Sequence, residues 1–193
     1  MEQAPTSPKP LRVMAPQRPC LALCLVLILG GCGAGRAPVW DPSAANLPAY
    51  TASDAALLDD RLSPEVFGAV VDPSDPVGRR ASLADGIVRA RLVTVTRDST
   101  GQSESYVLEL QPAPPALKGP DIAERLALTI PPANPSFAFV KSSDSELVGR
   151  PVIVIYKRYN EGGQATLRWH IEADNPRVME ALDRARIMGE LGR

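Results

Sequence analysis

The chain has 193 residues, of which 45% are hydrophobic, 22% charged and 5% aromatic, and its formal net charge is -1. These fractions exclude wholesale disorder and a multi-span membrane protein, and the near-zero charge provides no electrostatic basis for nucleic-acid binding. Twenty prolines, about twice the usual ~5% share, exclude a bundle of long helices. The single histidine excludes a metal centre with several histidine ligands.

The first 31 residues have the pattern of an export signal. Three basic residues precede an apolar run over 20–29, and small residues follow at once. A secretory signal has a basic region, an apolar stretch of ~7–15 residues and a small-residue cleavage site. The run is shorter than the ~20 residues of a transmembrane helix. Translation starts at Met1 or at Met14; the second start leaves a compact basic region ending at Arg18.

The end of this segment, Leu29-Gly30-Gly31-Cys32, resembles the lipobox of bacterial lipoproteins, in which an aliphatic residue and two small residues precede a cysteine. The resemblance implies that a diacylglyceryl group is attached to the Cys32 thiol. It also implies that the signal is cleaved before Cys32 and that the new amine is acylated. The alternative interpretation is a buried apolar helix with a chance cysteine.

Lipidation at Cys32 would leave the mature chain without a free thiol or a disulfide, because Cys20 and Cys24 lie in the signal. Cysteine catalysis and a cysteine-ligated metal are then excluded. The mature chain is mildly acidic, so the acyl chains rather than charge must hold it on the membrane. The residue directly after the cysteine is Gly33 and not an aspartate. In lipoproteins of enteric bacteria, this implies sorting to the outer membrane rather than retention in the inner one.

The mature chain divides into a tether and a domain. Residues 32–50 are rich in Gly, Ala, Pro and Ser and have no hydrophobic period, which is typical of a flexible linker. Trp40 is the one tryptophan of this segment. Residues 51–193 are expected to form a single globular domain.

The start of the domain predicts short helices. Ser53-Asp54 supplies a capping group for a helix over 51–62. Ser63-Pro64 has the pattern of an N-cap and a first helical residue for a turn over 63–67. We expect a further helical turn over 82–85.

From Ile87 the pattern becomes that of strands. Residues 87–97 and 105–111 predict a hairpin, and the proline-rich segment 112–120 predicts a loop. Residues 125–130 alternate between apolar and polar and predict another strand, and 137–140 predicts a short edge strand.

A second hairpin is predicted near the end of the chain. Residues 151–159 are apolar on both faces at their start, and 165–173 form the clearest amphipathic strand. Its expected inward residues are Leu167, Trp169 and Ile171, and its outward ones are Thr166, Arg168, His170 and Glu172.

The last segment predicts a helix. Asn175 is expected to cap it and Pro176 to occupy the first helical position. Apolar residues recur at helical spacing and predict a face that docks on the domain. They are Val178, Ala181, Leu182, Ala185, Met188 and Leu191.

Five to six strands with short N-terminal helices and a C-terminal helix predict a mainly β, α+β fold. We expect a small curled antiparallel sheet or an OB-like barrel. The region from Ile87 to about Ala173 resembles OB-type barrels, including the netrin-like modules of secreted proteins. It shares with them a long first strand, a hairpin, a loop ending in Gly119 and a late hairpin. Netrin-like modules are usually stapled by disulfides, which this chain cannot form.

His170 is the only candidate base for a Ser-His-Asp triad. The chain has no Gly-x-Ser-x-Gly elbow, and alternation places His170 on the polar face between Arg168 and Glu172. We therefore expect an exposed histidine without a catalytic role.

Acidic residues form three groups. Glycoside hydrolysis needs two carboxylates held close together, but solvated loops are the expected setting here. The groups are Asp59-Asp60, Asp72 with Asp75, and Asp144 with Glu146.

Basic residues on two predicted strands form a candidate polyanion-binding face, suited to a polysaccharide or a lipid head group. The alternative is a strand face laced with salt bridges. The candidate residues are Arg89, Arg91, Lys157 and Arg158.

These observations predict a lipid-anchored protein of the bacterial cell envelope, with a non-enzymatic binding or structural module that uses no metal or cofactor. The expected partners are the membrane, through acyl chains on Cys32, and an envelope protein or polysaccharide. The alternative is a membrane-anchored hydrolase that uses His170 or a carboxylate pair. A subunit of a larger envelope complex would expose an apolar patch of more than ~400 Å².

Overall fold

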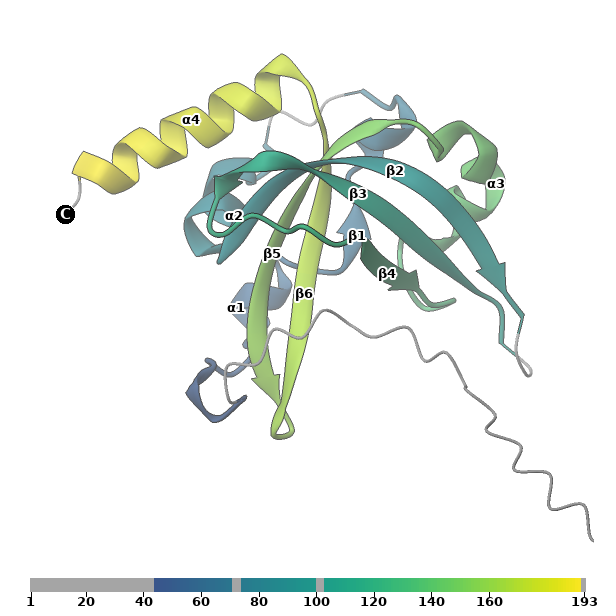
Figure 1. Cartoon of the computed structure of the whole chain (residues 1–193), viewed down its shortest axis with the longest axis horizontal. Helices are drawn as coiled ribbons and strands as arrows, with labels where there is room; N and C mark the ends of the chain where they lie inside the picture. The colour runs from purple at the N-terminus through teal and green to yellow at the C-terminus, as the bar shows by residue number, and fades with distance from the viewer. Residues whose placement is uncertain (1–43, 71–73, 100–102, 192–193) are drawn as a thin grey trace, which may run out of the picture. The chain divides into compact units, whose positions relative to one another are not determined.

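A computed structural model describes residues 44–70, 74–99 and 103–191 (Figure 1). The predicted signal, its cleavage site at Leu29-Gly30-Gly31, the candidate lipidation site Cys32 and Trp40 lie outside the described residues. Within the described ranges, no helix combines the length and the hydropathy needed to cross a membrane.

Six strands form one curled, mixed sheet, a half-barrel with the strand order β1-β6-β5-β2-β3-β4 (Figure 1). The predicted mainly β, α+β class is confirmed. Neighbouring strands are antiparallel except β1 and β6, which are parallel, so the sheet is mixed rather than purely antiparallel. The strands are β1 (Arg61–Leu62), β2 (Gly86–Asp98), β3 (Ser105–Lys118), β4 (Leu126–Ile130), β5 (Pro151–Glu161) and β6 (Gln164–Ala173).

Helices lie before, between and after the strands. The α-helices are α1 (Ala52–Ala55), α2 (Val77–Leu83), α3 (Phe137–Leu147) and α4 (Pro176–Leu191), and the 3-10 helices are η1 (Ala44–Asn46) and η2 (Pro64–Phe67). The predicted turn that begins with Ser63-Pro64 is η2, and the predicted Asn175 cap of α4 is present, since its Oδ1 accepts the Val178 N–H at 2.9 Å.

The first helix is shorter than predicted. Thr51, not Ser53, caps it: the Thr51 hydroxyl accepts the Asp54 N–H, and the Asp54 carboxylate accepts the Thr51 N–H, each at 3.2 Å. The helix ends after Ala55, and Asp60 adopts a positive φ of 55°. This turn sends residues 61 and 62 into β1, a strand that the helical pattern of 51–62 did not predict.

Two further predictions are wrong. The segment 112–120 was predicted to be a loop, but β3 continues through residues 112–118 and ends at Lys118. Its register shifts between Ile87 and Arg89 of β2, so Pro114 and Pro115 fall where the ladder is irregular and an N–H is not required.

The expected edge strand at 137–140 is instead the start of α3. Val140 and Leu147 are its buried residues, and they lie on either side of a kink at Ser143, where the backbone leaves the helical conformation. The four-residue window was too short to reveal a helix of 11 residues.

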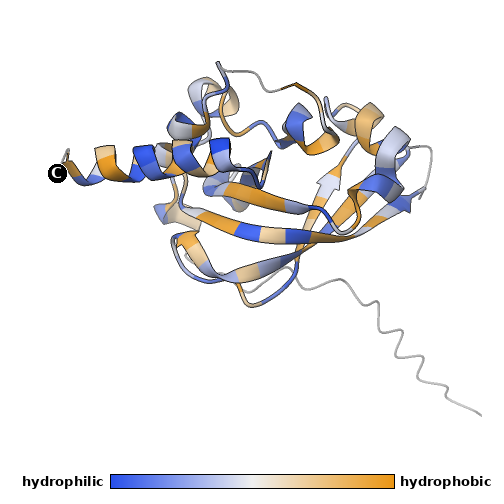
Figure 2. Ribbon diagram, turned by 90° about the horizontal axis from the view of Figure 1, so that it is seen from above, coloured by the Kyte–Doolittle hydropathy of each residue, from blue (hydrophilic) through white to orange (hydrophobic). Residues whose placement is uncertain are grey.

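The sheet is covered on both faces, as the apolar β5 requires. Figure 2 shows hydrophobic and hydrophilic residues alternating along the strands. The larger core lies on the face that α3 and η2 cover; it includes Leu62, Val88, Leu108, Val140, Val154, Trp169 and Ile171. The smaller core lies on the other face, under α2 and the start of α4; it includes Leu58, Val77, Ile153, Ile155, Val178 and Leu182.

The segment 59–63 is held from two sides. The Asp60 and Ser63 N–H groups donate to the carbonyls of Trp169 and Ile171 on β6, at 2.9 and 2.7 Å. On the other side, the Leu62 N–H donates to Ser136 Oγ at 2.9 Å, and Asn134 Nδ2 donates to the Asp60 carbonyl at 2.6 Å. These bonds fix the side chains of 59–63 relative to β6.

The end of the predicted tether also contacts the domain. Ala49 forms a bridge with Asn160 of β5. The Tyr50 hydroxyl donates to the Leu58 carbonyl at 2.6 Å, and its ring packs on the Tyr159 ring with centroids 4.9 Å apart. Residues from Ala44 onward therefore belong to the packed part of the chain.

Candidate functional site

The exposed position predicted for His170 is wrong. Its side chain is 1% exposed, and that of Glu172 is 0% exposed. Both lie opposite buried residues of the smaller core, with His170 paired to Ile155 and Glu172 to Ile153. The alternation along β6 was correct, but the face predicted to be wet is covered.

His170 lies between two carboxylates. Its Nδ1 is 2.8 Å from Asp59 Oδ1, and its Nε2 is 3.5 Å from Glu172 Oε1. Because an ionised carboxylate only accepts hydrogen bonds, the shorter contact is a hydrogen bond in the tautomer that carries its proton on Nδ1. The other Asp59 oxygen lies 2.7 Å from Arg61 Nε at the more exposed side.

Arg80 of α2 neutralises the other end of the cluster. It shares the buried face of α2 with Val77 and Ala81, and its side chain is 2% exposed. Its Nη1 donates to Glu172 Oε1 at 2.7 Å and also to Asp75, and its Nε donates to the Leu57 carbonyl at 2.9 Å.

These side chains form what we call the charge cluster: Asp59, Asp75, Arg80, His170 and Glu172. Acidic side chains alternate along it with His170 and Arg80, from Asp59 through His170, Glu172 and Arg80 to Asp75. Burial raises the pKa of Glu172; the negative charge of Asp75 adds to this, while His170, Arg80 and the Ser63 hydroxyl lower it. The raised pKa shows that the loss of hydration outweighs the neighbouring positive charges.

A cavity of about 310 Å³ opens beside the cluster. Ser63, 1% exposed, lines it together with His170. In the described part of the chain, Ser63 makes no hydrogen bond with the His170 ring. The structure thus contains an Asp–His pair but no hydrogen-bonded Ser–His–Asp triad among the described residues. Other lining residues are Arg61, Pro64, Glu65, Asp75, Pro76 and Arg80.

The solvated setting predicted for the six acidic residues is wrong for Asp59, Asp60 and Asp75. Asp59 and Asp75 belong to the charge cluster, and Asp60 binds Arg168 and accepts the Trp169 N–H at 3.0 Å. Asp144 and Glu146 are exposed as predicted, although on α3 rather than in a loop. Asp72 lies outside the described residues.

The predicted polyanion-binding residues do not form one patch. Arg89 pairs with Asp174 at 3.3 Å, and Arg91 donates to the Gly149 carbonyl at 3.1 Å. Lys157 lies 5.3 Å from the centroid of the Tyr159 ring, and Arg158 lies 3.8 Å from Asp85. Lys157 and Arg158 are consecutive in β5, so they project from opposite faces.

The sequence did not single out Arg80 or Glu172 as members of a cluster. Two features of the sequence could have indicated that Arg80 and Glu172 are buried. Arg80 follows Val77 by three positions, on the side of a short helix that must bury its apolar residues. Glu172 lies beside β5, which is apolar on both faces and so indicates a sheet covered on both sides.

Comparisons with known proteins identify no relative. No family model, curated protein or solved structure matches the chain. The resemblance to lipoproteins and the resemblance to OB-type barrels remain predictions. Among the residues that the structure describes, no group of three His, Cys, Asp or Glu side chains is placed to hold a metal ion.

Proposed function

We propose that the chain is a lipid-anchored protein of the bacterial cell envelope, with a non-enzymatic binding or structural domain. The lipobox-like Leu29-Gly30-Gly31-Cys32 supports the anchor, and Gly33 favours the outer membrane. One observation carries the non-enzymatic assignment: both nitrogens of the single histidine face carboxylates, Asp59 and Glu172.

A catalytic imidazole needs one nitrogen directed at a nucleophile or substrate while the other is oriented by a partner. In His170 the second nitrogen faces Glu172, which in turn binds Arg80. The members of the charge cluster therefore pair with one another, although His170 Nε2 and Glu172 Oε2 make no hydrogen bond among the described residues. The cluster joins β6, the segment 59–63 and α2, and this supports a structural role.

A hydrolase is the second candidate, and one observation favours it. Asp59 orients the His170 ring at 2.8 Å, and Ser63 lines the same cavity as that ring. Catalysis would require Glu172 to leave Nε2 and the Ser63 hydroxyl to replace it.

A fluorophosphonate probe, which labels activated serines, separates the two candidates. We expect no labelling of Ser63 in the wild-type chain, with a known serine hydrolase as the positive control. Labelling that disappears in both Ser63→Ala and His170→Ala would contradict the non-enzymatic assignment.

The anchor has its own test. In cells fed a labelled fatty acid, the wild-type chain should incorporate the label, and Cys32→Ser should abolish it and leave unprocessed precursor. Cys24→Ser is the matched control and should change neither result. Label retained by Cys32→Ser would refute lipidation at this cysteine.

A further inference from the structure

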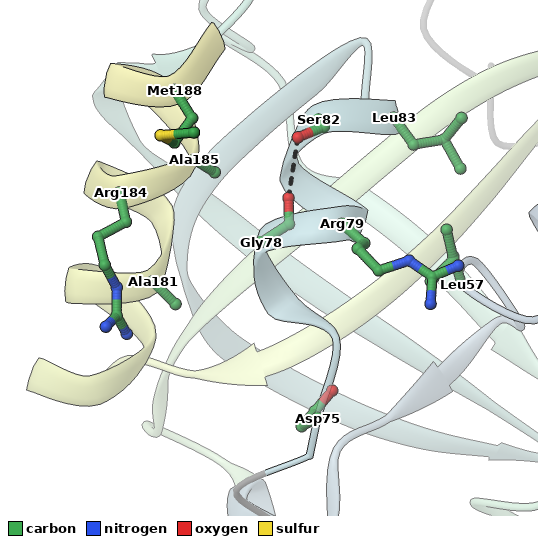
Figure 3. A pocket seen from close by; sticks show the side chains of 10 residues that line it. All are labelled: Leu57, Asp75, Gly78, Arg79, Ser82, Leu83, Ala181, Arg184, Ala185 and Met188. Atoms are coloured by element: carbon green, nitrogen blue, oxygen red, sulfur yellow. Dashed lines mark hydrogen bonds between the residues drawn. The ribbon is translucent and has the colours of Figure 1, made fainter.

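The C-terminal helix α4 extends beyond the part of the domain that covers it (Figures 1 and 2). Val178 and Leu182, in its first two turns, are its buried residues. Ala181 and Ala185 lie next to α2 near Gly78, where an added Cβ would be 3.8 Å from the Ala181 carbonyl oxygen (Figure 3). Arg184 and Met188 still line an open groove beside α2 (Figure 3), and the final turn of the sixteen-residue α4 extends beyond it.

The last turns of α4 expose large apolar side chains. Ile187 is 48% exposed, Met188 70% and Leu191 78%. Together with Arg184 they occupy positions i, i+3, i+4 and i+7, so they lie on one face of the helix. The docking face predicted from the sequence is therefore used only in part: Val178, Ala181, Leu182 and Ala185 pack on the domain, while Met188 and Leu191 remain uncovered.

The charges around this face are already paired within the helix. Arg184 lies 3.6 Å from Glu180, and Arg186 lies 3.3 Å from Glu190 and 3.9 Å from Asp183. The face has no excess charge to attract a strongly acidic or basic partner. Its distinctive chemistry is a narrow apolar strip with an arginine whose long side chain can reach a polar boundary.

We propose that the distal half of α4 lies in the interface of the membrane that carries the acyl anchor, with Ile187, Met188 and Leu191 directed into the lipid. This inference rests on the proposed lipidation of Cys32. A helix with one apolar and one polar face suits the boundary between head groups and acyl chains.

The length of the chain between the anchor and the domain supports this occupant. Twelve positions separate Cys32 from Ala44, the first described residue, and a fully extended chain of that length spans about 40 Å. The anchor thus holds the domain close to the bilayer. A tether raises the effective concentration of the strip at the membrane, so the strip needs less apolar area than an untethered helix to bind there.

A second copy of the chain fits the strip less well. Stable protein interfaces bury about 800 Å² on each partner, far more than three partly exposed side chains provide. The membrane is therefore the occupant that the size and charge of the strip favour.

The test uses the full-length, acylated chain in phosphatidylcholine vesicles. Because Cys32 is blocked by lipid in the mature chain, Met188→Cys provides one thiol for the environment-sensitive dye NBD. Arg186→Cys is the matched control, since it is exposed on the opposite side of the same helix. Mass spectrometry of the same samples confirms the acyl group.

We expect the NBD emission at position 188 to shift to the blue, rise severalfold and be quenched by spin-labelled lipid, also at high salt. The dye at position 186 should show none of these changes. Equal signals at both positions, or an aqueous spectrum at 188 in acylated chain, would overturn the inference while leaving the anchor intact. A shift at 188 that depends on protein density and not on lipid would assign the strip to a second copy instead. Absence of the acyl group would overturn the proposed function and this inference together.

Discussion

On one face of β6, Trp169 and Ile171 are buried by Tyr156 and Val154 of the neighbouring strand and by the rest of the larger core. On the other face, His170 and Glu172 are buried to the same degree, but His170 is held by a hydrogen bond to Asp59 and Glu172 by an ion pair with Arg80. Equal burial on the two faces thus has different physical causes.

The stability of the fold should therefore respond differently to substitutions on the two faces of β6. Apolar side chains stabilise in proportion to the area removed from water, so a smaller apolar residue keeps part of the effect. Buried charges lose hydration and stabilise only when they are paired. Removing one member leaves its partner buried and unpaired, whatever the shape of the replacement.

On the apolar face, Trp169→Ala should lower the free energy of unfolding by about 3–5 kcal/mol. Trp169 is 4% exposed and fills the larger core. Trp169→Phe should recover part of this loss, and Met188→Ala, at an exposed apolar position, should change stability by less than about 0.5 kcal/mol. Urea denaturation measures all three variants. A loss of similar size for Met188→Ala would contradict the described burial.

On the charged face, Arg80→Ala should cost about 3–5 kcal/mol, because the Glu172 carboxylate then stays buried without its guanidinium. Arg80→Met keeps the length of the side chain and should recover little. Recovery by methionine to near wild-type stability would mean that packing, not charge, holds this face. The same denaturation assay distinguishes the two outcomes.

His170→Ala should lower stability by about 1–3 kcal/mol, because the substitution removes a fully buried side chain and its hydrogen bond to Asp59. An exposed histidine, as the sequence predicted, would tolerate this change. The comparison variant is Thr166→Ala, a less buried position on the same strand. Equal stability of His170→Ala and wild type would contradict the buried position.

The pH dependence should separate the two faces further. Because the pKa of Glu172 is raised in the folded state, the folded chain retains a proton there that the unfolded chain has lost. Stability should therefore fall as the pH rises above the ordinary glutamate value of about 4.5. Glu172→Gln should flatten this decline, whereas Trp169→Ala should keep it. A decline of the same slope in Glu172→Gln would exclude Glu172 as its source.

Local patterns in the sequence predicted much of the sheet. The hairpins β2–β3 and β5–β6 follow from alternation and turn residues that are close in the chain. The start of α4 follows from the Asn175 cap and its apolar period. The same patterns predicted the wrong element at β1, which was expected to be helix, and at the start of α3, which was expected to be strand. The capping box at Thr51 and the turn before Phe137 determine where the neighbouring helices begin.

The charge cluster was beyond the reach of local patterns. Asp59 and His170 are 111 positions apart, and Arg80 and Glu172 are 92 positions apart. Alternation assigns side chains to a face of β6 but does not say which distant segment covers that face. Only the folded arrangement of α2 and 59–63 turns the polar face of β6 into a buried site.

A cluster that stabilises the fold as one network must couple Arg80 to Glu172 energetically, and a double-mutant cycle between these two residues tests this most directly. The cycle compares wild type, Arg80→Met, Glu172→Gln and the double variant by urea denaturation. We predict that the double variant loses much less stability than the sum of the single variants, with a coupling free energy in the range of about 0.5–3 kcal/mol. A coupling free energy of zero within error would contradict the account.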